Sequence, residues 1–254
     1  MILNFTEQGS GSPIILMHGM FGSLSNLGNL ARSLNKSHRV ISVDLRNHGD
    51  SPHDLVFDLS TMASDIVELM DFLSLPSANL VGHSLGGKVG MQVALNFPNR
   101  VKNLVVADIS PVAYKPKNDA ALDGLIALSN AKIDSRKHAE KILSHYVSDN
   151  LTRAFLLKNL QLRDDNLYEL KINMKAVSEN YLTNLVAAPF GNAFSGPCLF
   201  LKGEKSAYIQ TKHRPMIEAF FPESQIVTLP GVGHWLHAES PKMFNKLITD
   251  FLIN

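Results

Sequence analysis

A Gly-x-Ser-x-Gly motif at residues 82–86, with Ser84 at its centre, constrains this chain more than any other feature. The short run Asn79-Leu80-Val81 before it is typical of a buried strand, and apolar residues recur at helical spacing through 85–97. A serine between a strand and a helix lies in a tight, strained turn, and the N–H groups of the following helix point towards it. The motif therefore predicts that Ser84 is a nucleophile at the edge of a sheet.

Short apolar runs alternate with longer helical patterns in the first half of the chain and again near the C-terminus. Unbroken apolar runs indicate parallel strands that helices cover on both faces. We therefore expect an α/β fold, with a mostly parallel central sheet flanked by helices. The predicted strands are 14–17, 40–43, 79–81, 104–107, 198–201 and 225–229, and the predicted helices are 24–34, 62–73, 85–97 and 241–253.

Residues 111–196 interrupt this alternation. No strand pattern is evident there, whereas apolar residues continue at helical spacing. We interpret the stretch as a helical lid, inserted after the sixth strand and laid over the sheet. Residues 1–110 and 197–254 then form the core. Further helices that pack on the sheet without acting as a lid are the alternative.

His234 is the predicted general base, because a serine hydroxyl is a weak nucleophile until a base takes its proton. It lies in Gly231-Val232-Gly233-His234-Trp235, on a loop after the last predicted strand, where folds with this serine turn place their histidine. His237 is the competitor, but it lies nearer the final helix. The two histidines lack the His-Glu-x-x-His pattern of a zinc site, so no metal and no cofactor is expected.

The carboxylate that orients the histidine is marked less clearly. In folds of this kind it often follows the strand 198–201, but Ser206 occupies that loop and carries no charge. Asp108 directly follows the run 104–107, where a carboxylate is costly to bury without a partner such as the His234 N–H. Asp108 is therefore the predicted acid, and Glu204 is the alternative residue. A further alternative is that Asp108 has only a structural role and caps the next turn.

The loop His18-Gly19-Met20-Phe21-Gly22 follows the first predicted strand and is expected to help bind an oxyanion. The predicted donors are the backbone N–H groups of Met20 and Leu85, with Phe21 as the alternative to Met20. Side chains beside these loops are expected to contact the substrate, and they are Phe21, His83, Trp235 and Tyr208.

The loop after the second predicted strand contains Asp44 and Arg46. A charge-assisted pair between these two side chains is expected to hold the loop. Direct contact between Arg46 and substrate is the alternative.

Composition narrows the classes of partner and environment. A net charge of +1 without a basic run argues against nucleic acid. Cys198 is the only cysteine and lies in an apolar run, so we expect a buried residue and no internal disulfide. No signal-peptide pattern is evident, and no apolar run comes near the roughly 20 residues of a membrane helix. A cytoplasmic protein without a membrane span is expected.

The motifs together resemble the α/β-hydrolase superfamily over nearly the whole chain. They are His18-Gly19, Asp44-x-Arg46-x-His48-Gly49-x-Ser51, Gly82-His83-Ser84-Leu85-Gly86-Gly87 and Gly233-His234-Trp235. More narrowly, the chain looks like the small bacterial esterases of the YbfF type in Phe21-Gly22-Ser23, Arg46-Asn47-His48-Gly49, Gly86-Gly87-Lys88 and Asp108-Ile109-Ser110-Pro111-Val112. This resemblance implies an esterase or thioesterase with a helical lid. It also implies an acid after the sixth strand, because that group likewise lacks Asp at the position of Ser206.

These patterns predict a serine hydrolase that cleaves carboxylic esters through an acyl-enzyme, with a small-molecule ester or thioester as its partner. An acyl-CoA thioesterase is the alternative enzyme. Lys115 and Lys117 could meet the phosphates of such a substrate, or they could form a solvated basic face. A hydrolase-fold protein that binds a ligand without turnover is the third alternative. No pattern reports acyl chain length or oligomeric state.

Overall fold

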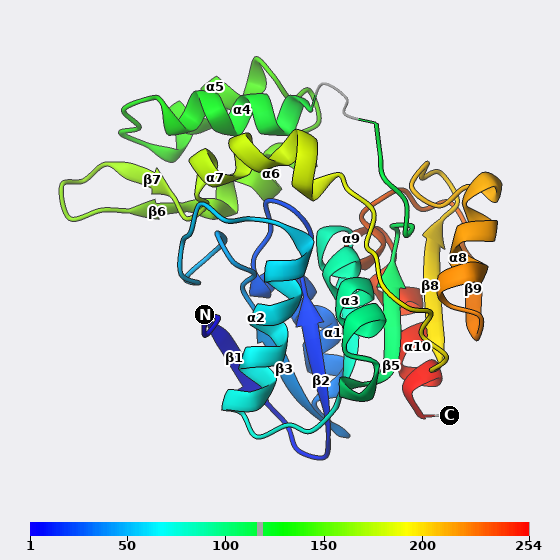
Figure 1. Ribbon diagram of the computed structural model, residues 1–254. Helices are drawn as coiled ribbons and strands as arrows, with labels where there is room; N and C mark the ends of the chain where they lie inside the picture. The colour runs from blue at the N-terminus through cyan, green and yellow to red at the C-terminus, as the bar shows by residue number, and fades with distance from the viewer. Residues whose placement is uncertain (116–118, 254) are drawn as a thin grey trace.

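A central sheet with helices on both faces forms the body of the molecule in the computed structural model, which describes residues 1–115 and 119–253 (Figure 1). Its strands run parallel except β1, which pairs antiparallel with β3 at one edge. This arrangement confirms the predicted α/β fold. The spatial order is β1 (Phe5–Gln8), β3 (His38–Val43), β2 (Ser12–Met17), β4 (Ala78–His83), β5 (Val101–Ala107), β8 (Cys198–Gly203) and β9 (Ser224–Leu229).

The interior strands carry apolar side chains on both faces, which explains their unbroken apolar runs. In β2, Ile15 and Met17 belong to the buried cluster that includes side chains of α2 (Leu59–Phe72) and α3 (Leu85–Asn96). Ile14 and Leu16 belong to a second cluster, which includes side chains of α1 (Gly28–Leu34) and α10 (Pro241–Ile253). The helices of the body are α1 (Gly28–Leu34), α2 (Leu59–Phe72), α3 (Leu85–Asn96), α8 (Arg214–Phe220), α9 (Leu236–Glu239) and α10 (Pro241–Ile253). Short 3-10 turns lie at Leu24–Leu27, Pro98–Arg100, Leu157–Asn159 and Thr211–His213.

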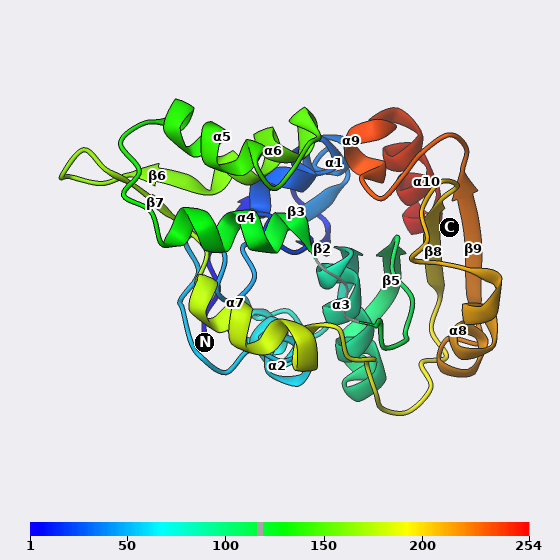
Figure 2. The ribbon, with the colours of Figure 1, turned by 90° about the horizontal axis from the view of Figure 1, so that it is seen from above.

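The chain between β5 and β8 forms a second layer above the carboxyl ends of the strands (Figure 1). Seen from above, it lies over the β2 and β3 side of the sheet and leaves β8 and β9 uncovered (Figure 2). We call residues 111–196 the insertion. Its elements are α4 (Ala120–Ser129), α5 (Arg136–Ser144), α6 (Asn150–Leu156), β6 (Leu160–Leu162), β7 (Tyr168–Leu170), α7 (Met174–Asn180) and a π-helical turn at Tyr181–Leu185.

Three sequence expectations about the elements were wrong. The insertion contains an antiparallel strand pair, β6 and β7, although no strand was expected there. Strands of three residues each are too short to show a periodic pattern. The edge strand β1 was missed because its two middle residues are exposed, so it has no apolar run. The insertion also follows β5, the fifth strand of the chain, and not a sixth strand, because only β1 to β5 precede it.

No helix in the described parts of the chain has both the length and the apolar character needed to span a membrane.

Candidate active site

Ser84 lies in the turn between β4 and α3, as the motif predicts. Its backbone has φ 50° and ψ −115°, a strained conformation for a residue with a side chain. A Cβ on Gly82 would lie 2.1 Å from the Gly86 carbonyl oxygen, so only glycine allows the turn to close. The Ser84 N–H donates to the Ala107 carbonyl at 2.9 Å, which ties the turn to the end of β5. Strain and close packing therefore fix the serine at the carboxyl edge of the sheet.

Asp108 and His234 form the contact that the sequence predicted. His234 Nδ1 donates to Asp108 Oδ2 at 2.7 Å, and the aspartate is fully buried. Asp108 Oδ1 accepts the Gly203 N–H at 3.0 Å, and Oδ2 also accepts the Ser206 hydroxyl. These donors stabilise the buried charge. Because Nδ1 carries the donated proton, His234 Nε2 is left as the proton acceptor.

Glu204, the alternative acid, points elsewhere. Its carboxylate accepts the Gly231 N–H at 2.7 Å and so braces the start of the loop that carries His234. Sequence reasoning dismissed Ser206 because it lacks a charge, but its hydroxyl donates to Asp108. The sequence did offer one signal of this role, because Ser206 lies in the loop where an acid was expected.

Aromatic side chains surround the His234 imidazole. The Tyr208 ring lies 4.3 Å from it between ring centroids, and the Trp235 ring lies at 5.8 Å. His83 is buried, and its Nε2 donates to the His234 carbonyl at 2.9 Å. His234 is therefore held through its own backbone as well as through Asp108. Desolvation keeps the pKa of His83 well below its ordinary value, so this ring is neutral.

A cavity of about 950 Å³ opens beside Ser84 and His234. The insertion contributes apolar side chains to its wall, including Phe155, whose ring lies 4.4 Å from that of Trp235. Lys115 also lines it, whereas Lys117 lies outside the described residues. All other residues predicted for the site line this cavity as well, apart from Asp108, which is buried behind His234; they are Met20, Phe21, His83, Leu85, Trp235 and Tyr208.

The loop after β2 brings its backbone against the serine. The Gly22 N–H donates to the Gly19 carbonyl at 3.0 Å and closes a tight turn over residues 19–22. A Cβ on Gly19 would lie 3.3 Å from the Ser84 Cβ, so the turn lies directly against Ser84. Among the described residues, neither the Met20 N–H nor the Leu85 N–H donates to a protein acceptor. Both are therefore free to bind an oxyanion.

Phe21, the alternative donor, is already engaged. Its N–H donates to His48 Nε2 at 3.2 Å, and His48 Nδ1 donates in turn to the Arg46 carbonyl at 3.0 Å. His18, in the loop after β2, links the same two loops in the opposite direction, because its Nε2 accepts the N–H of Leu45 in the loop after β3 at 3.0 Å. Burial lowers the pKa of His18 to about 4 and that of His48 to about 3, so both rings are neutral acceptors near pH 7.

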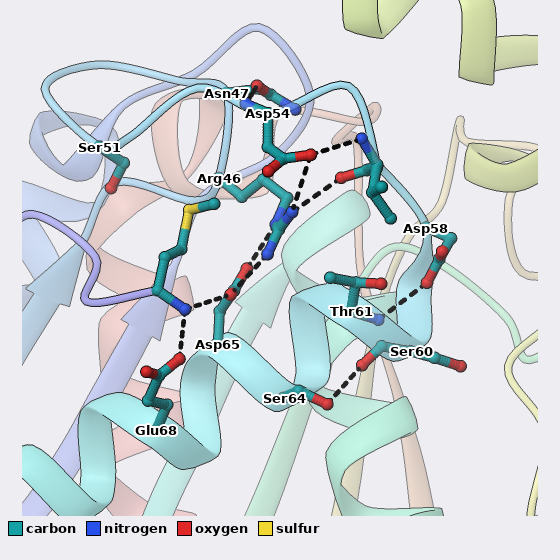
Figure 3. A network of polar contacts seen from close by, with 12 residues as sticks. Arg46, Asn47, Ser51, Asp54, Asp58, Ser60, Thr61, Ser64, Asp65 and Glu68 are labelled. Carbon is teal, nitrogen blue, oxygen red and sulfur yellow. Dashed lines mark hydrogen bonds and ion pairs between the residues drawn. The ribbon is translucent and has the colours of Figure 1, made fainter.

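Arg46 holds the loop after β3, but not through Asp44 as the sequence suggested. Its guanidinium forms a two-pronged pair with Asp65 of α2, at 2.7 and 2.8 Å, and also donates to the Val56 carbonyl at 2.8 Å (Figure 3). Asp44 instead accepts the Leu24 N–H at 2.7 Å. Arg46 is buried in this network, which argues against substrate contact.

Lys88, one helical turn after Ser84, is a buried lysine to which sequence reasoning assigned no role. Its Nζ donates to the carbonyl oxygens of Val186, at 2.9 Å, and Ala187, where the insertion returns to the body. It also lies 5.0 Å from the centre of the Tyr114 ring at the start of the insertion. Burial lowers its pKa to about 7. Lys88 therefore joins both ends of the insertion to the helix that begins at the serine.

A serine in a strand-to-helix turn, beside a histidine paired with a buried aspartate, defines the class of α/β-hydrolases. The chain belongs to the alpha/beta hydrolase fold family, whose model matches residues 12–241. It is 38% identical over 258 residues to the sn-1-specific diacylglycerol lipase ABHD11 of Danio rerio, covering 98% of this chain and 80% of that protein. It is 35% identical over 247 residues to the esterase YbfF of Escherichia coli K12, covering 97% and 95%.

Solved structures agree with this assignment. A structure named as a marine microorganism esterase superimposes with a TM-score of 0.94 at 38% identity, covering 98% of this chain and 99% of that one. The protein is therefore an enzyme of the esterase and lipase group of hydrolases.

Proposed function

We propose that the protein is a serine carboxylesterase in which Ser84 is the nucleophile, His234 the general base and Asp108 the residue that orients the base. The observation that carries this proposal is the 2.7 Å hydrogen bond from His234 Nδ1 to the buried Asp108, beside the cavity that Ser84 also lines. A buried, fully satisfied carboxylate on Nδ1 selects the tautomer whose Nε2 accepts a proton.

In the proposed cycle, Ser84 Oγ attacks the ester carbonyl carbon while His234 Nε2 takes the hydroxyl proton. The Met20 and Leu85 N–H groups bind the oxyanion, which Phe21 cannot do while its N–H donates to His48. His234 then protonates the leaving alcohol, and the acyl group stays on Ser84. A water molecule, activated by His234, attacks this acyl-enzyme and releases the carboxylic acid.

The proposed substrate is a small carboxylic ester with an apolar acyl chain. The apolar cavity wall supports this choice, with Phe155 and Leu156 supplied by α6. In this proposal residues 111–196 act as a lid over the core 1–110 and 197–254. The relatives' names, an esterase and a diacylglycerol lipase, agree with an ester substrate.

An acyl-CoA thioester is the second candidate, because Lys115 and Lys212 also line the cavity and could meet an anionic leaving group.

A series of p-nitrophenyl esters from acetyl to palmitoyl tests this function. Each methylene that enters the apolar cavity is expected to raise kcat/KM by about fourfold, until the acyl chain reaches the wall. The measurement is kcat/KM for each ester, with Ser84→Ala as the control and acyl-CoA thioesters of matched length as the comparison. Thioester turnover that far exceeds ester turnover would select the second candidate. No turnover of either class would favour a protein that only binds a ligand.

A further inference from the structure

Phe21 has a backbone conformation that aromatic residues rarely adopt. Its φ is 60°, and it is the third residue of the turn closed by the Gly22 N–H and the Gly19 carbonyl. Turns with positive φ at this position favour glycine, because a side chain there is strained. Met20, the proposed oxyanion donor, is the second residue of the same turn. The surrounding structure must therefore hold Phe21 if Met20 is to keep its position.

The first contact that holds Phe21 comes from the body of the protein. The Phe21 N–H donates to Nε2 of the fully buried His48, which fixes the Met20–Phe21 peptide. Because His48 Nδ1 donates to the Arg46 carbonyl, its Nε2 is the unprotonated nitrogen and accepts the Phe21 proton.

The second contact comes from the insertion. Asn159 Nδ2 donates to the Phe21 carbonyl at 2.8 Å and to the Leu156 carbonyl, at the end of α6, at 3.0 Å. Asn159 is 4% exposed, so solvent does not compete for these bonds. Its contact fixes the Phe21–Gly22 peptide, the other peptide of the strained residue. Both sides of Phe21 are thus held, one by the body and one by the insertion.

We propose that Asn159 is a positioning residue, which together with His48 holds Phe21 in its strained turn and so keeps the Met20 N–H aimed at the oxyanion. The inference rests on the proposed function, because it assigns a purpose to the Met20 donor. Its consequence is that the oxyanion site is complete only while the insertion is seated on the body. Asn159 follows Phe155 and Leu156, which line the cavity, so one segment covers the substrate and completes the site.

Asn180 provides a matched control for Asn159. It also belongs to the insertion, and its Nδ2 also bridges a carbonyl of the body, Leu55 at 3.1 Å, and a helix carbonyl, Ala176 at 2.9 Å. It does not touch Phe21 or line the cavity. Loss of an insertion contact in general can therefore be separated from loss of the Phe21 contact.

The test compares Asn159→Ala with Asn180→Ala in the full chain. Asn159→Ala is expected to lower kcat/KM by about 10- to 100-fold. This loss is smaller than the loss caused by removing an oxyanion donor altogether, because the Met20 N–H is still present but less well aimed. The affinity for an alkylboronic acid, which forms a tetrahedral adduct with an active-site serine, should fall by the same factor. Asn180→Ala should leave both within about threefold. An unchanged boronic acid affinity, or equal effects of the two variants, would overturn the inference.

Phe21→Gly provides a second test of the Asn159 contact. Glycine adopts positive φ without strain, so the turn no longer needs the Asn159 contact. Within the Phe21→Gly background, Asn159→Ala should therefore lower kcat/KM by less than about threefold. An undiminished loss there would also overturn the inference. Activity retained by Ser84→Ala would instead overturn the proposed function, so the two failures are distinguishable.

Discussion

Replacing Ser84 with alanine is expected to lower kcat/KM for p-nitrophenyl esters by about 10⁴-fold or more. In the proposed mechanism the substitution removes the atom that forms the acyl-enzyme bond, and His234 then has no hydroxyl from which to take a proton. The residual rate should be that of water attack on a bound ester. The measurement is steady-state hydrolysis by wild type and variant purified in parallel.

The Ser84→Ala protein should remain folded, because the hydroxyl donates no hydrogen bond to the described parts of the protein. A thermal unfolding midpoint close to that of wild type is the control. A folded variant that keeps more than about a tenth of the activity would show that another residue, or water alone, attacks the ester.

Asp108→Asn is expected to cost nearly as much, on the order of 10⁴-fold in kcat. The Asp108 oxygens accept from Gly203 N–H, Ser206 hydroxyl and His234 Nδ1. An asparagine that still accepts the Gly203 N–H turns its NH₂ group towards His234. The imidazole must then accept at Nδ1 and hold its proton on Nε2, the wrong tautomer for taking the serine proton. The measurement is the pre-steady-state acylation rate.

Glu204→Gln is the matched control for Asp108→Asn. It removes a carboxylate of the same region, but one that accepts from Gly231 N–H and not from His234. Its activity should stay within about threefold of wild type. If Glu204→Gln lost activity and Asp108→Asn did not, the orienting role would belong to Glu204.

Local patterns predicted the sheet, and they singled out three residues that the structure brings together at the candidate site. Ser84 was predictable because the glycines on either side of it allow one strained turn to close. His234 was predictable because its loop follows the last strand. Asp108 was predictable as a carboxylate that directly follows the apolar run 104–107 and needs a partner there. Each of these signals lies within a few residues of the chain.

The other parts of the site depend on contacts between distant segments. Ser206 donates to Asp108 across 98 positions of sequence, and Asn159 reaches Phe21 across 138. No periodic pattern marks a polar side chain whose partner is a backbone carbonyl elsewhere in the fold. Lys88 was visible as part of a motif, but its acceptors at Val186 and Ala187 appear only when the insertion is in place.

Labelling with a fluorophosphonate, followed by intact-protein and peptide mass spectrometry, is the experiment that decides whether Ser84 is an activated nucleophile. Such probes react with a serine whose hydroxyl a neighbouring base activates, and no metal or cofactor is required. We predict one adduct per chain, located on Ser84, absent in Ser84→Ala and formed far more slowly in Asp108→Asn. An unlabelled Ser84 in a protein that still hydrolyses esters, or an adduct on a different residue, would contradict the proposed mechanism.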